Sequence, residues 1–193
     1  KVTEAVKGRR SIRRYLDKPI DLEKAKEIIE NALWAPSPMN RQPWHFVIIS
    51  KEENYLVLKR AVKESYTSIE KKLEEIFADK PYVLESTKRF FESMGGAPLG
   101  ILAFLDSTYE SQEEFSMVQG VSAVLQNICL LAYSEGLGTC WLTAPLSVEE
   151  KIRSIIGKKL GLKLGRLVAL ITMGYPREKP YVPPRKAGRL TWL

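Results

Sequence analysis

The stretch VQGVSAVLQNICLLAYSEGLGTCWL, residues 118–142, decides the fold. Residues 118–135 carry a single charged side chain, Glu135, so we expect a helix that lies at the centre of the molecule. Gly136 is the expected end of this helix, because glycine readily adopts the left-handed conformation that closes a helix. Residues 138–143 (GTCWLT) then predict a strand.

More helices are predicted on both sides of this stretch. Thr3 is the expected N-cap of a short helix over residues 3–10, and Asp21 caps a second helix that Pro36 stops. Residues 52–93 favour helix in two or three pieces. Ser147 and Glu150 have the spacing of a capping box, which predicts one more helix after the strand at 138–143.

The other predicted strands are short and apolar. Residues 45–50 (HFVIIS) predict a buried strand, and residues 100–106 and 167–173 predict two more. Residues 35–43 contain three prolines, so this segment is expected to be a structured, extended loop. The C-terminal extension, residues 174–193, contains four prolines and ends in apolar side chains, so we expect it to dock on another subunit.

Length and composition indicate one folded domain over residues 1–193. The chain is 45% hydrophobic and 27% charged, has no linker or repeat, and shows no apolar run long enough to span a membrane. Nothing at its start resembles a signal peptide, so we expect a cytoplasmic protein. The net charge of +7 is compatible with nucleic acid, a membrane surface or a phosphorylated small molecule.

The placement of the basic residues favours a compact anion over nucleic acid. No Lys or Arg lies between Arg89 and Lys151, and the arginines gather at the two ends of the chain. Two such clusters can converge on one anion, whereas a nucleic-acid surface usually follows a face with interleaved aromatic residues. The alternative is that these residues are solvated surface charges.

Groups for acid–base or nucleophilic catalysis are scarce. His45 is the only histidine and opens a predicted strand, and the two cysteines, Cys129 and Cys140, lack metal-ligand spacing. Neither a dinucleotide-binding glycine motif nor a P-loop is present. Such a protein takes its chemistry from a cofactor, or performs none.

Four segments, in this order, resemble the FMN-dependent nitroreductases. They are RRSIRRY (9–15), APSPMNRQPWHFVII (35–49), GV with QNICLLAYSEGLGTCWL (120–142), and GYPREKP with PPRK (174–186). The resemblance implies an α+β fold with a central, mainly antiparallel sheet surrounded by helices. It also implies a homodimer that exchanges its C-terminal tails and holds FMN at the interface.

The resemblance assigns the phosphate of FMN to the two chain ends. Arg9 and Ser11 would hold the phosphate, Arg10 the ribityl and phosphate region, and Arg185 with Lys186 would close on it from the tail. Guanidinium forks suit phosphate oxygens better than ammonium groups do.

Three further groups would contact the rest of the flavin. Arg13 matches the basic residue beside the N1 and C2 carbonyl edge of the ring, where a cation stabilises the charge that appears on reduction. A loop reaches the flavin of the other subunit, through Pro36, Ser37, Pro38, Asn40 and Gln42. The end of the third strand would contribute backbone contacts, from Trp141, Leu142 and Thr143, although the family often has Glu-Gly where this chain has Thr143 and Ala144.

The resemblance implies an NAD(P)H oxidoreductase that reduces nitroaromatics, quinones or similar planar acceptors by a ping-pong mechanism. Residues 52–94 match nothing specific and are a candidate lid. Phe90, Phe91 and Met94 are candidates to face the acceptor, and core packing is the expected role of at least one of them. One alternative is a relative of the same fold that breaks down flavin or removes iodine from iodotyrosine. A second alternative is a basic binding protein without turnover.

Overall fold

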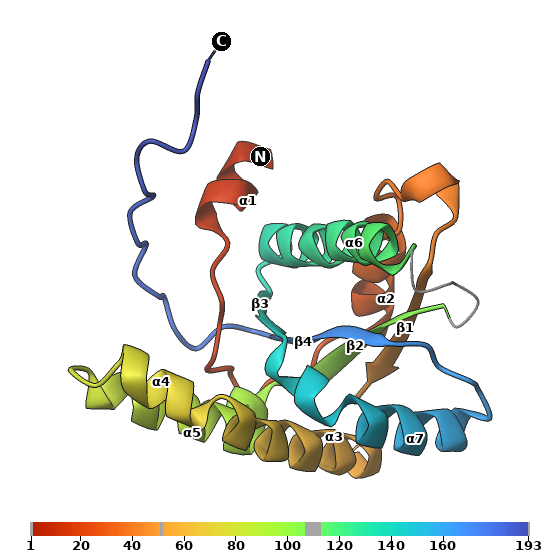
Figure 1. Cartoon of the computed structure of the whole chain (residues 1–193), viewed down its shortest axis with the longest axis horizontal. Helices are drawn as coiled ribbons and strands as arrows, with labels where there is room; N and C mark the ends of the chain where they lie inside the picture. Colours follow the sequence, from red (N-terminus) through yellow and green to blue (C-terminus); the bar gives the residue numbers. More distant parts are fainter. Residues whose placement is uncertain (1, 51, 107–112, 193) are drawn as a thin grey trace.

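Helix α6 (Glu114–Ser134) lies across one face of a sheet in the computed structural model, which describes residues 2–50, 52–106 and 113–192 (Figure 1). The side chains on the sheet-facing side of α6 are fully buried, from Met117 through Val121, Val124 and Ile128 to Ala132. The cap residue is Glu135, and Gly136 follows with a positive φ of 74°. The expected central helix and its stop are therefore confirmed.

The sheet has four strands in the order β1-β2-β4-β3, and every pair is antiparallel. The strands are β1 (Trp44–Ile49), β2 (Leu99–Leu105), β3 (Gly138–Leu142) and β4 (Leu167–Gly174). Successive residues of β2 alternate between the two faces, so Ile101 joins the core beneath α6 and Leu102 joins the core on the other side. The predicted α+β fold with a mainly antiparallel sheet is confirmed.

Helices cover both faces of the sheet (Figure 1). Helix α2 (Leu22–Ala32) packs with α6 on one face, and Asp21 caps it by accepting a hydrogen bond from the main-chain N of Glu23. The opposite face is covered by three helices: α3 (Glu52–Ser65), α5 (Pro81–Ser93) and α7 (Glu149–Leu160). Strands buried on both faces need apolar residues at every position, which explains the continuous apolar runs of β2 and β4.

Strand β1 differs from the expectation of a buried strand. It is an edge strand that pairs only with β2 among the described elements, and the side chains of His45 and Ile48 are exposed. Periodicity along the chain does not reveal strand order, so an edge strand with three isoleucine or valine residues resembles a buried one. The position of β1 also leaves the only histidine of the chain on the outer surface.

Two predicted helix caps are wrong. Thr3 lies inside helix α1 (Val2–Gly8), which also ends earlier than expected. Ser147 belongs to a short 3₁₀ helix, η4 (Ala144–Val148), where its hydroxyl donates to the carbonyl of Ala144 at 2.9 Å, and α7 begins only afterwards. A serine hydroxyl that bonds within its own turn cannot cap the next helix, and the sequence does not show which bond wins.

The segment over residues 52–93 is helical in several pieces, as expected, with α4 (Glu70–Ile76) between α3 and α5. The candidate acceptor residues Phe90, Phe91 and Met94 are all core residues, at 2%, 4% and 0% exposed. Of these three, only Phe90 also lines a cavity. Phe91 and Met94 therefore have the alternative role, core packing beneath the sheet, and are wrong as candidates to face an acceptor.

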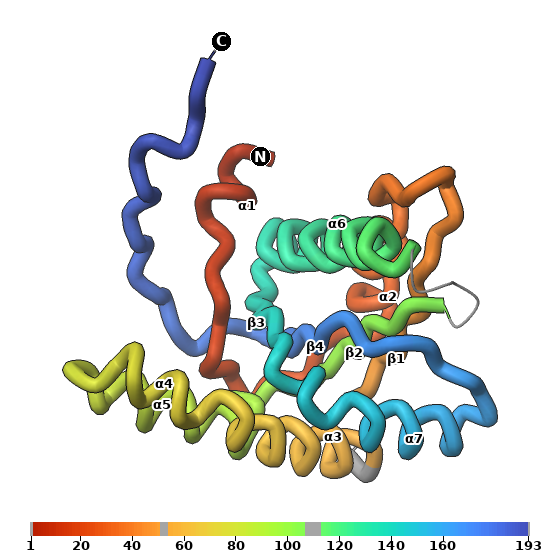
Figure 2. The backbone as a smooth tube through the Cα atoms, viewed as in Figure 1, coloured from red at the N-terminus to blue at the C-terminus, as the bar shows by residue number. Residues whose placement is uncertain are grey.

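By length and mean hydropathy alone, α6 could cross a membrane. Its buried side packs against the sheet, and the central helix of a layered fold has the same composition. The tail beyond the sheet has a different character: residues 181–192 are exposed throughout, including Trp192 at 91%. Figure 2 shows its end standing clear of the helices, and Leu193 lies outside the described residues.

The turn η3 (Met94–Gly96) comes against the N-terminal segment at Gly95. A Cβ atom at Gly95 would lie 2.1 Å from the carbonyl oxygen of Arg13, and the residue has a φ of 65°. This close approach to the main chain requires glycine.

Gly95→Ala is predicted to destabilise the protein more than Gly136→Ala, although both positions have positive φ. Gly136→Ala should cost about 1–2 kcal/mol for the left-handed backbone, since nothing lies within 4 Å of the added atom. Gly95→Ala should cost about 1–3 kcal/mol more, because Arg13 must move. Urea unfolding of both variants measures the difference, and equal losses would contradict the close contact.

Candidate functional site

An extended segment, residues 9–15, is held by main-chain hydrogen bonds to three distant parts of the chain. The N–H of Ile12 donates to the carbonyl of Thr139 in β3, and the N–H of Tyr15 donates to that of Gly95, both at 2.9 Å. The N–H of Arg177, at the root of the tail, donates to the carbonyl of Arg14, also at 2.9 Å. The segment is therefore rigid, and its arginines have fixed main-chain positions.

Tyr15 adds a side-chain anchor to this segment. Its hydroxyl donates to the carbonyl of Ile12 and is hydrogen-bonded to Oγ1 of Thr172, both at 2.8 Å. Burial raises the pKa of Tyr15 well above its usual value, so the hydroxyl stays protonated and the bond to Ile12 persists. Tyr15 thus fixes the main chain at Ile12, between Ser11 and Arg13.

Two adjoining cavities flank the segment. The first, here named the α5 cavity, has a volume of about 810 Å³ and lies between Ser11, Arg13, helix α5 and the tail root. The second, the α1 cavity, has a volume of about 400 Å³ and lies between residues 7–12, the end of α6 and the tail. Both volumes are in the range of small-molecule sites. Glu178 and Pro180 border both cavities.

The two arginines of the α1 cavity contain unsatisfied donors. The Nε atoms of Arg9 and Arg10 are buried and have no hydrogen-bond partner among the residues that the structure describes. Arg10 uses one terminal nitrogen to donate to the carbonyl of Arg9 at 2.5 Å. A buried cationic donor without an acceptor is costly, and an anion in the adjoining cavity would relieve that cost. The arrangement fits a phosphate.

Glu178 is a site residue that the sequence analysis missed. Its carboxylate accepts from the N–H of Arg13 at 2.6 Å and from Nε of Arg14 at 2.8 Å, so it clamps the tail root onto the N-terminal segment. The only signal in the sequence is an acidic residue within the basic stretch at 177–179. Its partners lie more than 160 residues away, as the separations of 165 and 164 show.

The loop with Pro36 and Pro38 is more strained than an extended loop. It contains the turn η1 (Pro38–Asn40), and Met39, Asn40 and Gln42 all have positive φ values, between 49° and 53°. Ser37 stabilises the turn, since its Oγ accepts from the N–H of Gln42 at 2.9 Å. Left-handed non-glycine residues persist only where the surroundings enforce them, and they gather at functional sites.

One subunit does not bring this loop near the arginines. The loop packs on α6 at Gly120, whose added Cβ would lie 3.3 Å from Ser37 and Pro38, whereas Tyr133 of α6 lines the α1 cavity. Gly120 and Tyr133 are about 20 Å apart along a helix of ideal rise. The predicted site residues therefore form two groups at opposite ends of α6.

The remaining predicted residues lie in neither group. Trp141 packs partly buried against the core beneath α6, Leu142 is buried on the other face of the sheet, and Thr143 is exposed. Arg185 and Lys186 are exposed in the tail, where Arg185 donates to the carbonyl of Pro183 at 3.3 Å. Any contact of these side chains with a ligand of the cavities requires movement of the tail or a second subunit.

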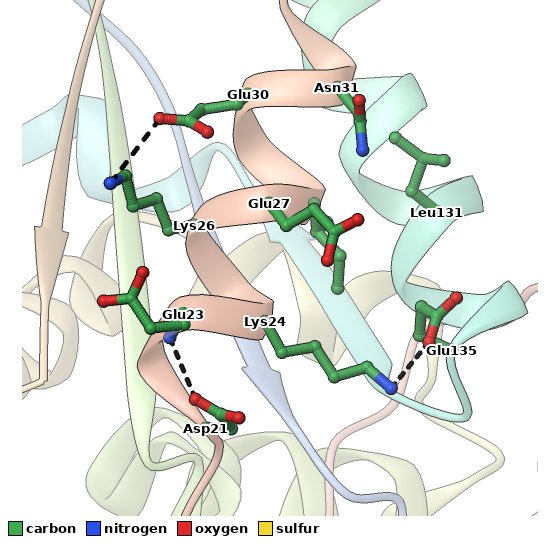
Figure 3. Close-up of a pocket in the computed structure, with 10 residues that line it drawn as sticks. Asp21, Glu23, Lys24, Lys26, Glu27, Glu30, Asn31, Leu131 and Glu135 are labelled. Carbon is green, nitrogen blue, oxygen red and sulfur yellow. Dashed lines mark hydrogen bonds and ion pairs between the residues drawn. The ribbon is translucent and has the colours of Figure 1, made fainter.

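A further hollow, of about 500 Å³, lies on the outer side of α2 (Figure 3). Lys24 pairs with Glu135 at 2.6 Å and Lys26 with Glu30 at 3.9 Å, and three further carboxylates, Asp21, Glu23 and Glu27, leave the hollow acidic and unsuited to an anion such as a phosphate. In the described part of the chain, no group of three or more His, Cys, Asp or Glu side chains could hold a metal ion. The hollow therefore offers less to a ligand than the two arginine-lined cavities.

Comparisons with known proteins agree with this fold. The sequence matches the model of the nitroreductase family over residues 6–175. It is 31% identical over 181 residues to a Methanothermobacter thermautotrophicus protein provisionally named NADH dehydrogenase/NAD(P)H nitroreductase, which spans 93% of this chain and 79% of that one. It is also 28% identical over 191 residues to iodotyrosine deiodinase of Hydra vulgaris, spanning 94% and 67%.

A solved structure has the same fold. The provisionally named nitroreductase of Desulfovibrio desulfuricans, in complex with FMN, superposes with a TM-score of 0.73 at 26% identity. The superposition covers 98% of this chain and 94% of that one.

The two thiols of the chain are unsuited to nucleophilic chemistry. Burial raises the pKa of Cys140 to about 11, and it also raises the pKa of Cys129, although a hydrogen bond to Thr139 opposes that shift. At pH 8 only about one Cys140 in a thousand is a thiolate, which is the reactive form.

Neither thiol should react with a disulfide reagent in the native protein at pH 8, whereas both should react at once in urea. The native rate should rise with pH up to about 11, as the thiolate of Cys140 forms. A colorimetric thiol assay measures both states. Rapid native reaction at pH 8 would show that the burial of these residues is wrong.

Proposed function

The chain belongs to the nitroreductase family, and from that premise we propose that it is an FMN-dependent NAD(P)H oxidoreductase that reduces nitroaromatics, quinones or similar planar acceptors. The observation that carries the proposal is the pair of buried, unpartnered Nε atoms of Arg9 and Arg10 beside an open cavity. A phosphate in this cavity would give these donors an acceptor. The FMN complex of the Desulfovibrio desulfuricans protein supports the choice of FMN.

The residues of the N-terminal segment would hold the cofactor. Arg9, Arg10 and Ser11 would bind the phosphate and the ribityl chain, and Arg13, which lines the α5 cavity, would lie beside the ring. Arg13 is held in place through its N–H, which donates to Glu178, and through the anchor of Tyr15 on Ile12. Bound FMN would supply the redox chemistry, taking a hydride from NAD(P)H and passing electrons to an acceptor.

The side chains around the α5 cavity would orient the reductant and the acceptor and would not donate protons to them. The single histidine of the chain lies on the outer strand, and both thiols are buried in the core. Protons for the acceptor would therefore come from solvent, which reaches the open cavity. Reductant and acceptor would use this same space in turn, which is a ping-pong order.

A second subunit would complete the site. In one chain the loop with Asn40 and Gln42 is about 20 Å along α6 from the arginines. The loop of one subunit can meet the arginines of the other if α6 of both subunits cross in a dimer. The exposed tail with Arg185, Lys186 and Trp192 would then pack on the partner. We place this dimer in the cytoplasm.

Reductive removal of iodine from a halotyrosine is a second candidate. It is favoured by the similarity to iodotyrosine deiodinase over 94% of this chain. Assays with reduced enzyme and iodotyrosine, run beside assays with a nitroaromatic, separate the two reactions.

A chain that stops after Pro180 is predicted to lose both FMN and the dimer. The variant keeps the Glu178 clamp but removes the exposed tail with its basic and aromatic side chains. Light scattering and the visible flavin spectrum of the purified protein measure the two losses.

The matched control is the full-length chain with Arg185→Gln and Lys186→Gln. This double variant should bind FMN more weakly but remain dimeric, because it keeps Trp192 and the other apolar tail residues. A truncated protein that stays yellow and dimeric would contradict the role of the tail.

Arg13→Ala is predicted to lower the reduction potential of bound FMN, and Arg9→Ala to weaken FMN binding. A guanidinium beside the ring favours its negatively charged, reduced state more than its neutral, oxidised state. A guanidinium at the phosphate contributes equally to both states. Equilibration with a reference dye gives the potential, and ultrafiltration gives the affinity.

Each of the two variants is the control for the other, because each removes one arginine from the same segment. If Arg13→Ala released FMN and left the potential of the remaining bound flavin unchanged, Arg13 would be a further phosphate ligand instead.

A further inference from the structure

Helix α5 turns a polar face toward the α5 cavity. Six residues of this helix line the cavity, and Phe90 is the one apolar side chain among them. The other five are polar or amphipathic: Tyr82, Glu85, Ser86, Arg89 and Ser93. The apolar side chains of the helix, such as Phe91, pack toward the sheet instead. A site for an apolar ring alone would be lined by apolar side chains. This wall instead fits a polar substituent on the substrate.

The facing wall is rich in arginine. Arg13, Arg14 and Arg177 line the cavity opposite α5, so with Arg89 the lining has four arginines against Glu85 and Glu178. Arg14 is paired with Glu178 at 2.8 Å, and Arg89 with Glu85 at 2.6 Å. Arg13 and Arg177 form no ion pair with any residue that the structure describes. The lining therefore has an excess of two positive charges.

Arg177 lines the α5 cavity and has no role in the proposed cofactor site. Its main chain is fixed by the hydrogen bond from its N–H to the carbonyl of Arg14, and the neighbouring Glu178 anchors the tail root. Its side chain is exposed at the edge of the cavity. A solvated surface arginine would not need a clamped main chain or a concave surface shared with three other arginines.

We propose that Arg177 and Arg89 bind an anionic group of the substrate in the α5 cavity, so that the enzyme prefers substrates carrying a carboxylate or a phosphate. The proposal rests on the proposed function and names its substrate class. Both anions present the paired oxygens that a guanidinium binds best. The carboxylate would belong to an aromatic acceptor, and the phosphate to the adenosine 2′-position of NADPH.

Glu85 sets the strength of this site. Its carboxylate accepts from both Nε and Nη2 of Arg89, at 2.9 and 2.6 Å, and so competes with any anionic ligand for that guanidinium. Removing the carboxylate charge would free Arg89, whereas removing Arg89 would leave Glu85 to repel the ligand. The two substitutions therefore have opposite expected effects.

The first experiment compares 4-nitrobenzoate with 4-nitrobenzamide, which has nearly the same shape and no charge. In the FMN-loaded enzyme, Arg177→Gln should lower the ratio of kcat/KM for the acid to that for the amide about tenfold, the loss expected for one charge-assisted hydrogen bond. Glu85→Gln should raise the same ratio several-fold. A gain of function of this kind does not follow from damage to the fold.

Lys88→Gln is the matched control. Lys88 lies on α5 beside Arg89, is exposed, and does not line the cavity. The Lys88→Gln substitution removes one positive charge, as Arg177→Gln does. It therefore reports the general electrostatic attraction of a basic protein for anions. In this variant the ratio of kcat/KM for 4-nitrobenzoate to that for 4-nitrobenzamide should change less than twofold.

The second experiment distinguishes the two sources of the anion. The ratio of kcat/KM for NADPH to that for NADH is measured in the same variants, and adenosine 2′,5′-bisphosphate and AMP are titrated by calorimetry. If the phosphate is the ligand, Arg177→Gln lowers the NADPH ratio and the affinity for the bisphosphate about tenfold. If the carboxylate is the ligand, only the acceptor ratio falls, and 4-nitrobenzoate loses calorimetric affinity.

The proposal is overturned if Arg177→Gln and Glu85→Gln leave every ratio and affinity as in the parent protein, or if Lys88→Gln changes them equally. Failure of the proposed function has a different signature: the purified protein would be colourless and would not turn over NAD(P)H. A yellow, active protein that does not distinguish acid from amide, or NADPH from NADH, would refute only the anion site.

Discussion

The main-chain hydrogen bonds of residues 9–15 are the constraint on which the rest of the site depends. An extended segment outside a sheet must find partners for its N–H and C=O groups, because unpaired buried groups are costly. Here the partners come from β3, from the turn at Gly95 and from the tail root at Arg177. Three parts of the chain are thereby brought together around one line of arginines, and the two cavities form on its flanks.

Helix α6 imposes the second constraint. Its length separates the strained loop, which packs at Gly120, from the arginine segment, which lies near Tyr133. Strain at Met39, Asn40 and Gln42 is costly for a loop without a role, yet in a single chain this loop faces no cavity arginine. A site shared between two subunits accounts for both the strain and the separation.

Two carboxylates offset part of the positive charge in the α5 cavity. Glu178 neutralises Arg14 while it fastens the tail root, and Glu85 neutralises Arg89 on the facing helix. Of the arginines that line the α5 cavity, Arg13 and Arg177 have no ion-pair partner among the described residues and are available to a ligand. The fold thus supplies fixed positive charge, a concave space and a dry core, and it leaves electron transfer to a cofactor.

The sequence by itself determined the elements and the family. The nearly uncharged stretch before Gly136, the apolar strands and the segment RRSIRRY are local patterns, so they can be found without knowing what packs where. Only the tertiary structure decided that β1 is an edge strand, that Ser147 bonds within its own turn and that Glu178 clamps Arg13 and Arg14. The reason is physical: strand order, competition between hydrogen bonds and contacts across 165 residues depend on groups that are distant in the chain.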